Sequence, residues 1–176
     1  MALKKKKATK KSAKKNIILE TNKGNIVIEL LSDLAPRHCE RILELSKEKY
    51  FDDVVFHRVI EGFMAQTGDG QYGSLKNGLD VDRAGMGGSD LPDLDPEFTS
   101  EPFVRGIVGM ARSQSPNSAN SQFFIMLEDS PHLNNQYTVW GKVVKGMDIV
   151  DKIKKGDQLD NGKVDAPDFI KTIINV

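Results

Sequence analysis

The chain has 176 residues, which is enough for one domain with a full core and short for two. Its 25 basic and 25 acidic side chains cancel, but unevenly: residues 1–15 hold eight lysines and no acid, which leaves 17 basic and 25 acidic side chains in residues 16–176. No run of 18 apolar residues occurs, so we expect no membrane span, and the single cysteine, Cys39, excludes an internal disulfide.

Residues 1–15, MALKKKKATKKSAKK, combine dense positive charge with almost no apolar surface. Such a segment cannot bury enough surface to fold, so we expect a disordered lysine-rich tail and one folded domain at residues 16–176. The tail lacks the apolar stretch of a secretory signal and the arginines of a transit peptide, and we expect a cytoplasmic protein. Charge alone would let the tail bind a polyanion, but no aromatic residue is present to stack on bases, which favours nonspecific contact.

The first predicted elements are a hairpin and a helix. Residues 17–21 and 25–30 flank a turn that ends in Gly24, and the second segment alternates apolar with polar residues, which predicts a β-hairpin. Pro36 then opens a helix that runs to about residue 49. Cys39 lies among the apolar residues of this helix, so we expect a buried structural thiol.

The rest of the chain reads as short strands around one long excursion. Residues 66–104 hold seven glycines and the turns at Pro92 and Pro96, and they predict a long loop. The other predicted elements are strands at residues 54–60, 107–111, 122–127, 138–144 and 169–176, and a helix at residues 147–154. Many strands, two helices and no alternating βα rhythm favour an antiparallel sheet closed on itself.

One predicted strand carries a charge among apolar neighbours. In FHRVIEGFMAQTGD, residues 56–69, alternation puts Arg58 on the same face as Phe56 and Ile60, with His57 opposite. Arg58 is then either buried with a partner or exposed at the rim of an apolar surface. We interpret His57 as a hydrogen-bonded structural histidine.

Three patterns that suggest cofactor or metal chemistry fail on their context. Residues 68–73 match GxGxxG, but no amphipathic helix follows. Residues 157–168 resemble a calcium loop, yet Leu159 and Asp168 occupy ligand positions that require other side chains, so we interpret the segment as a surface loop. The three histidines have no ligand spacing. We expect no metal, no cofactor and no covalent nucleophile.

Three segments remain unexplained: FHRVIEGFMAQTGD (56–69), GMARSQSPNSANSQFFIML (109–127) and HLNNQYTVWGKVVKGMDIVDKI (132–153). In this order and at this separation they resemble the cyclophilins, the peptidyl-prolyl cis-trans isomerases, and within that family the sequence looks bacterial. The resemblance covers residues 17–176. It implies a mainly β fold, a closed eight-stranded antiparallel β-barrel capped by two α-helices, in agreement with the elements above.

The resemblance also implies a function. The protein is expected to accelerate rotation about X-Pro peptide bonds and to assist folding, with proline-containing peptides and unfolded proteins as partners. We expect a monomer. Matched by motif position, the catalytic residues would be Arg58 and Gln66. Nine more positions match the substrate-binding groove: Phe63, Met64, Ala111, Arg112, Gln122, Phe124, His132, Leu133 and Tyr137.

Some of these positions depart from the pattern of many eukaryotic members. His132 stands where they have tryptophan, Tyr137 where they have histidine, and Arg112 where asparagine is frequent. The smaller ring of His132 suggests weak binding of cyclosporin with proline turnover retained.

Two other classes of function stay open at this point. The domain is either an isomerase or a proline-peptide binding or scaffold module with little catalysis, and the presence of Arg58 and Gln66 favours the enzyme. A third reading is a nucleic-acid-associated protein in which the tail does the binding and the domain serves as an adaptor.

Overall fold

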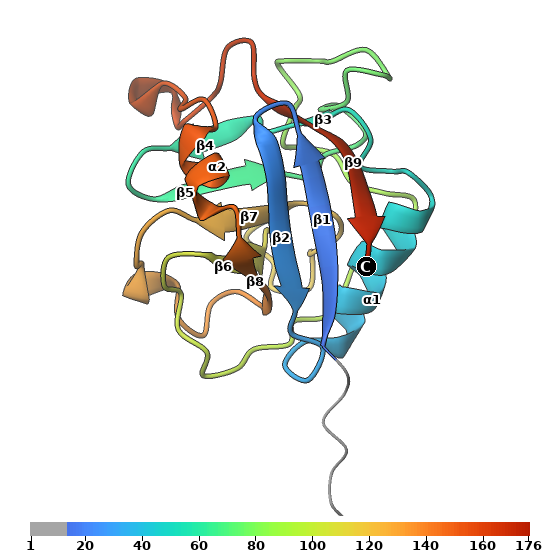
Figure 1. The fold of residues 1–176 in the computed structure, drawn as a ribbon, viewed down its shortest axis with the longest axis vertical. Coiled ribbons are helices and arrows are strands. Elements are labelled where there is room, and N and C mark those ends of the chain that lie inside the picture. Colours follow the sequence, from blue (N-terminus) through green and yellow to red (C-terminus); the bar gives the residue numbers. More distant parts are fainter. Residues whose placement is uncertain (1–13) are drawn as a thin grey trace, which may run out of the picture.

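The computed structural model describes residues 14–176, and most of them surround one antiparallel sheet curled into a half-barrel (Figure 1). Its strands are β1 (Lys15–Thr21), β2 (Gly24–Leu30), β3 (Val54–Val55), β4 (Arg58–Ile60), β5 (Met64–Thr67), β6 (Ile107–Met110), β7 (Phe123–Met126), β8 (Val139–Lys145) and β9 (Phe169–Asn175). They follow the order β3-β9-β1-β2-β8-β6-β7-β5-β4. The helices are α1 (Pro36–Lys47) and α2 (Met147–Lys152), with 3-10 turns η1 (Pro131–Leu133) and η2 (Gln158–Asp160).

The predicted hairpin is confirmed. β1 pairs with β2 from Lys15 opposite Leu30 to Thr21 opposite Gly24, so a two-residue turn joins them. Gly24 has a φ of +136°, a conformation that glycine adopts without steric cost. Buried and less buried residues alternate along both strands, because one face of the hairpin covers the core.

The strand predicted at residues 54–60 is two strands, and this changes the expected barrel. Phe56 N donates to Asp168 O, and Val164 N donates to the carbonyl of His57, so the chain between β3 and β4 bonds to residues 164–168 instead of continuing one ladder. This division and β5, a strand that the sequence analysis did not predict, give the sheet nine strands, not the eight that the resemblance implies. Within residues 14–176 no ladder joins β3 to β4, so the sheet is an open half-barrel and the closed barrel is not confirmed.

The predicted helices are both present, each ending two residues early. Helix α1 packs against β8 and β9, and α2 packs against β2. Cys39 is buried at 2% exposure, as expected, and its thiol donates to the carbonyl of Trp140. In the main core the Trp140 ring meets Phe123 edge to face at 5.3 Å.

A second, smaller apolar cluster lies next to the main core. Its buried members are Met64, Phe103, Ile107, Phe124, Met126, Leu133 and Val139. Phe63, Ala111 and Tyr137 pack against it while staying partly exposed. This cluster is the apolar base on which the candidate site is built.

The predicted long loop connects β5 to β6 and is held by buried polar contacts. Asp69 is fully buried and accepts backbone N–H bonds from Gln71, Tyr72, Gly85 and Gly87. His38 of α1 contacts Glu97 at 2.6 Å, and the Arg41 guanidinium donates to the carbonyls of Pro92 and Asn120. These contacts fix a segment that has little regular structure of its own.

Most of the predicted tail lies outside the described residues. Lys14 and Lys15 are described, and Lys15 already belongs to β1, so the boundary predicted after residue 15 falls inside a strand. In residues 14–176 there is no helix with the length and apolar character needed to cross a membrane. The monomeric state and the cytoplasmic location stay predictions.

Candidate active site

Three neighbouring strands align the central residues of the site. Arg58 on β4 lies opposite Gln66 on β5, and Gln66 lies opposite Phe124 on β7. Residues directly opposite one another in paired strands point to the same face of the sheet. Register alone therefore places the guanidinium, the amide and the aromatic ring in one row.

The alternation predicted around Arg58 is correct for Arg58 to Ile60, which form β4, but not for Phe56. Arg58 and Ile60 are partly buried and Val59 between them is fully buried, as alternation requires. Phe56, in contrast, belongs to the main core, because the chain leaves the ladder between β3 and β4. Of the two outcomes expected for Arg58, the structure combines both: the side chain is half-buried and it has partners.

Hydrogen bonds connect the polar side chains of this row. Arg58 Nη1 donates to Gln66 Oε1 at 3.2 Å, and Gln66 Nε2 donates to Gln122 Oε1 at 3.1 Å. Gln122 Nε2 then donates to the carbonyls of Gly85 and Gly87 at 2.9 and 2.8 Å. In this row of hydrogen bonds, the side-chain amides of Gln66 and Gln122 each both donate and accept. The orientation of both side chains is therefore fixed by their neighbours.

Asn161 is a partner of Arg58 that sequence reasoning missed. Its backbone carbonyl accepts from Arg58 Nε at 3.0 Å, and its Oδ1 accepts from Nη2 at 3.1 Å. The segment after η2 lies along the free edge of β4. There the backbones of Arg58 and Lys163 form an isolated antiparallel β-bridge, and Val59 N donates to Gly162 O. Asn161 has a φ of 52°, which asparagine tolerates better than most residues. The Asn-Gly pair signals a turn, but no local pattern links it to a residue 103 positions away.

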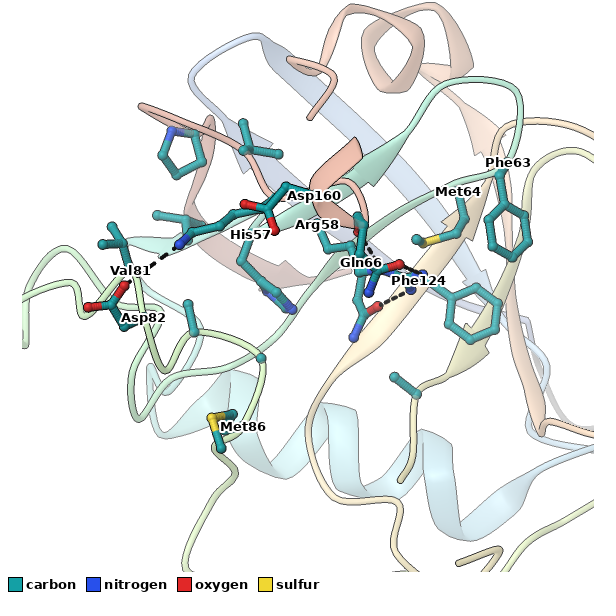
Figure 2. A pocket seen from close by; sticks show the side chains of 18 of the residues that line it. His57, Arg58, Phe63, Met64, Gln66, Val81, Asp82, Met86, Phe124 and Asp160 are labelled. Carbon is teal, nitrogen blue, oxygen red and sulfur yellow. Dashed lines mark hydrogen bonds and ion pairs between the residues drawn. The ribbon is translucent and has the colours of Figure 1, made fainter. Parts of the chain in front are cut away.

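The apolar side of the site contains the predicted proline pocket. Phe63, Met64, Phe124, Leu133 and Ala111 all line one cavity with Arg58 and Gln66. Figure 2 shows Phe63, Met64 and Phe124 at one end of this cavity, with Arg58 and Gln66 next to them. The pocket therefore places apolar surface directly beside a cation and an amide.

Arg112 and Tyr137 line the same cavity and contact each other. The Arg112 guanidinium lies 4.7 Å from the centroid of the Tyr137 ring and donates to the carbonyl of Gln136. The Tyr137 ring meets Phe124 edge to face at 5.7 Å. Such a cation–π contact is favourable, and it fixes the edge of the pocket.

Two predicted groove residues do not line the cavity. Gln122 supports Gln66 through the hydrogen bond described above. His132, in η1, is exposed and stacks at a tilt against Phe63, with 5.7 Å between ring centroids. His132 thus supports a pocket wall from outside, and weak binding of cyclosporin stays a prediction.

Burial lowers the pKa of two neighbouring groups. Desolvation lowers the pKa of Arg58, opposed by the nearby Tyr137, but a guanidinium stays protonated at neutral pH. Desolvation also lowers the pKa of His57 to about 4, so His57 is neutral. His57 is buried as expected, but its Nδ1 has no hydrogen-bond partner among the described residues, so the hydrogen bond expected for this histidine is not confirmed.

The cavity has a volume of about 630 Å³, the size of sites that hold a ligand of several chemical groups. In residues 14–176 no three His, Cys, Asp or Glu side chains gather in a way that would hold a metal ion. The site therefore combines the fixed guanidinium of Arg58, the amides of Gln66 and Gln122, and an apolar pocket. This set can hold and polarise an amide that carries an apolar ring.

Comparison with known proteins gives consistent results. A family model described as cyclophilin type peptidyl-prolyl cis-trans isomerase/CLD matches residues 16–175. A probable peptidyl-prolyl cis-trans isomerase of Brucella suis is 60% identical over 154 residues, which cover 88% of this chain and 79% of the relative. The human peptidyl-prolyl cis-trans isomerase-like 3 is 38% identical over 140 residues, 80% of this chain and 82% of the relative.

Solved structures show the same fold. A cyclophilin-type isomerase of Cryptosporidium parvum matches with a TM-score of 0.78 and 28% identity, covering 93% of this chain and 98% of the other. The same enzyme in the presence of the dipeptide Ala-Pro matches with a TM-score of 0.76 and 29% identity, covering 90% and 97%.

Proposed function

The chain belongs to the family of cyclophilin-type peptidyl-prolyl cis-trans isomerases, and we propose that Arg58 is the group that stabilises the twisted X-Pro bond. Rotation about this bond is slow because the amide loses its partial double bond, with a barrier of about 20 kcal/mol. No σ bond is broken during this rotation. The reaction therefore needs a site that binds the twisted amide more tightly than either planar form.

The electronic change on twisting indicates where that stabilisation acts. As conjugation is lost, the proline nitrogen becomes pyramidal and gains a lone pair that can accept a hydrogen bond. A guanidinium has five N–H donors, and three of those of Arg58 are bound by Asn161 and Gln66. One N–H on each terminal nitrogen is left for the substrate. A donor aimed at the new lone pair stabilises the twisted state alone.

One hydrogen bond from Arg58 supplies only part of the transition-state stabilisation that the reaction requires. A 10⁵-fold acceleration requires roughly 7 kcal/mol, and one charge-assisted hydrogen bond supplies about 1.5–3 kcal/mol. We assign the remainder to holding the proline ring while the preceding residue turns. The clamp would be formed by Phe63, Met64, Phe124 and Leu133, with Ala111, Arg112 and Tyr137 at its edge. Gln66 would orient the amide, and Gln122 would hold Gln66 in place. His132 would stiffen the wall behind Phe63.

The single observation that carries this proposal is the row formed by Arg58, Gln66 and Phe124, which sets a fixed cation against an apolar pocket. The substrate, a proline ring next to an amide, has the same combination of surfaces. The Ala-Pro dipeptide used with the Cryptosporidium parvum relative has this composition too.

The experiment is exchange NMR on a short Ala-Pro peptide with and without the protein. We expect catalytic amounts to broaden and merge the separate cis and trans signals of the peptide. A protein that shifts the peptide signals by binding but leaves the exchange rate at its uncatalysed value would be a binding module, and the proposal would fail.

A further inference from the structure

The cavity does not end at the proline pocket. It continues past Arg58, on the side away from Phe63 and Phe124, and Figure 2 shows Val81, Asp82 and Met86 at this other end. The apolar lining here comes from the long loop and from the segment after η2: Leu79, Val81, Ala84, Met86, Val164 and Pro167. None of these residues belongs to the proline clamp or to the chain of amides.

Two of these apolar side chains are unusually exposed. Met86 is 78% exposed and Val81 is 52% exposed, although both line a cavity that also contains Arg58. Leu159, fully exposed, lies in η2 directly before the cavity residues Asp160 and Asn161. Exposed apolar side chains that gather at the mouth of a site mark a surface that is covered when a partner binds.

The backbone that presents Met86 is held on both sides. Asp69 Oδ2 accepts from Gly85 N at 2.8 Å and from Gly87 N at 3.0 Å. Gln122 Nε2 donates to the carbonyls of the same two glycines. Gly85 also lies against the His57 ring, where an added Cβ would come within 3.1 Å. An exposed methionine on a fixed backbone is available for contact, and its flexible side chain adapts to different apolar groups.

The charges around this end largely cancel. His57, which lines it, is neutral at pH 7 because burial lowers its pKa to about 4. At the rim, Asp82 pairs with Lys163 at 3.7 Å. Besides this pair, the charged residues of the lining are one acid, Asp160, and two cations, Arg58 and Arg112. The surface between them is apolar and carries no net charge of its own.

We propose that this end of the cavity is a second subsite, which binds a large apolar side chain of the same peptide on the far side of Arg58 from the proline. The occupant follows from continuity, since one cavity joins the two ends and a peptide seated in the proline pocket must leave it along the groove. The inference rests on the proposed function for the position of the proline. It adds that clients with leucine, methionine or phenylalanine near the proline are preferred.

The test is a peptide scan read out by affinity. The host peptide contains one Ala-Pro unit flanked on each side by three alanine or serine residues. At each of these six positions in turn, two peptides are compared, one with leucine and one with serine at that position. Dissociation constants are measured by NMR titration against the wild type. We expect one position at which leucine binds about fivefold to tenfold more tightly than serine, because a leucine side chain leaves water there.

Polar variants of matched shape locate the effect. In the double variant Val81→Thr, Met86→Gln, the leucine-to-serine ratio at that position should fall to within twofold of unity. The control is Val144→Thr, a valine of similar exposure (45%) on β8 that does not line the cavity, and it should keep the wild-type ratio. A ratio near one at every position in the wild type, or a preference that survives in the double variant, overturns the proposal.

Two further outcomes are separable. If the leucine preference is present but no peptide exchanges faster than in buffer, the subsite stands and the isomerase proposal fails. If sedimentation instead shows a dimer that the double variant dissociates, Val81 and Met86 serve a second copy of the chain and the subsite proposal is wrong.

Discussion

The guanidinium of Arg58 is positioned by residues from two directions. Gln66 holds one terminal nitrogen from the neighbouring strand, and Asn161 holds Nε and the other terminal nitrogen from a turn. The planar group is thus fixed before substrate arrives, which lowers the entropy lost in each hydrogen bond it forms with the twisted amide. Asn161 acts through Arg58 and is a positioning residue.

Replacing Asn161 with glycine should separate positioning from folding. Glycine keeps the positive φ without strain and retains the carbonyl that accepts from Nε, so only the bond from Nη2 to Oδ1 is lost. We expect kcat to fall about threefold to tenfold with KM nearly unchanged, measured by exchange NMR over a range of peptide concentrations. Asn161→Asp retains an acceptor oxygen and should restore most of kcat. Equal losses in both variants would contradict a role for Oδ1.

His57 makes stability depend on pH. Its pKa is lowered to about 4 chiefly by burial, with a smaller upward effect of Asp69 and a downward effect of Arg58. The unfolded chain binds a proton near pH 6.5 and the folded one does not, so stability falls as pH falls from about 6.5 to 4. Urea unfolding at pH 7.5 and 4.5 should show wild type losing about 2–3 kcal/mol more than His57→Gln. His38 is present in both proteins, and identical losses would contradict the assignment.

At the scale of elements, the long loop between β5 and β6 is the wall of the site with the least regular structure, yet it is firmly attached. Asp69 lies two residues after the end of β5 and accepts hydrogen bonds from four backbone N–H groups in two stretches of the loop. Gln122, next to β7, holds the same glycines by their carbonyls. The wall that presents Met86 is therefore fixed to the strands that carry Gln66 and Phe124.

Asp69→Asn should destabilise the protein clearly. The amide nitrogen would replace one acceptor oxygen and face N–H groups in a fully buried place, which we expect to cost roughly 2–4 kcal/mol of unfolding free energy. The control is Asp82→Asn in the same loop, where the pair with Lys163 is exposed and should contribute less than about 0.5 kcal/mol. Denaturant unfolding measures both. Similar values for the two variants would show that Asp69 does not hold the loop.

These elements also show what sequence alone determines. The β1–β2 hairpin depends on a local turn and α1 begins at Pro36, and both were predicted within two residues. The division of residues 54–60 was not, because it depends on bonds to residues 164–168, which are remote in the sequence. The motif resemblance identified Arg58, Gln66 and Phe124. It did not indicate Asn161, or the hydrogen bonds from Gly85 and Gly87 to Asp69, because these contacts also join residues that are remote in the sequence.

At the scale of the whole molecule, charge is separated along the chain. Residues 1–13 contain six of the 25 basic side chains, which leaves 19 basic and 25 acidic side chains in the part that the structure describes. The sheet and both apolar clusters are complete within that part. We propose that the terminal segment contributes to association with polyanions and not to the fold.

Deleting residues 1–13, and no more, tests this. The cut leaves Lys14, which lies 3.7 Å from Glu29, and Lys15, which pairs with Leu30 in β1. The melting temperature and the turnover of a short peptide should not change, while binding to heparin should weaken and lose most of its salt dependence, since six positive charges are removed. A melting temperature several degrees lower would show that the segment stabilises the folded part.

The claim that most of the account depends on is that Arg58 acts on the twisted amide and not merely on binding. The direct measurement is the exchange rate and the dissociation constant of one Ala-Pro peptide, taken from the same NMR samples, for wild type, Arg58→Ala and Arg58→Lys. We predict that alanine lowers the catalysed rate at least 100-fold, about 3 kcal/mol, while affinity changes less than threefold. Lysine should restore little, because a point charge does not replace a planar donor held at three atoms. An Arg58→Ala protein that binds the peptide and exchanges it at near the wild-type rate would contradict the account.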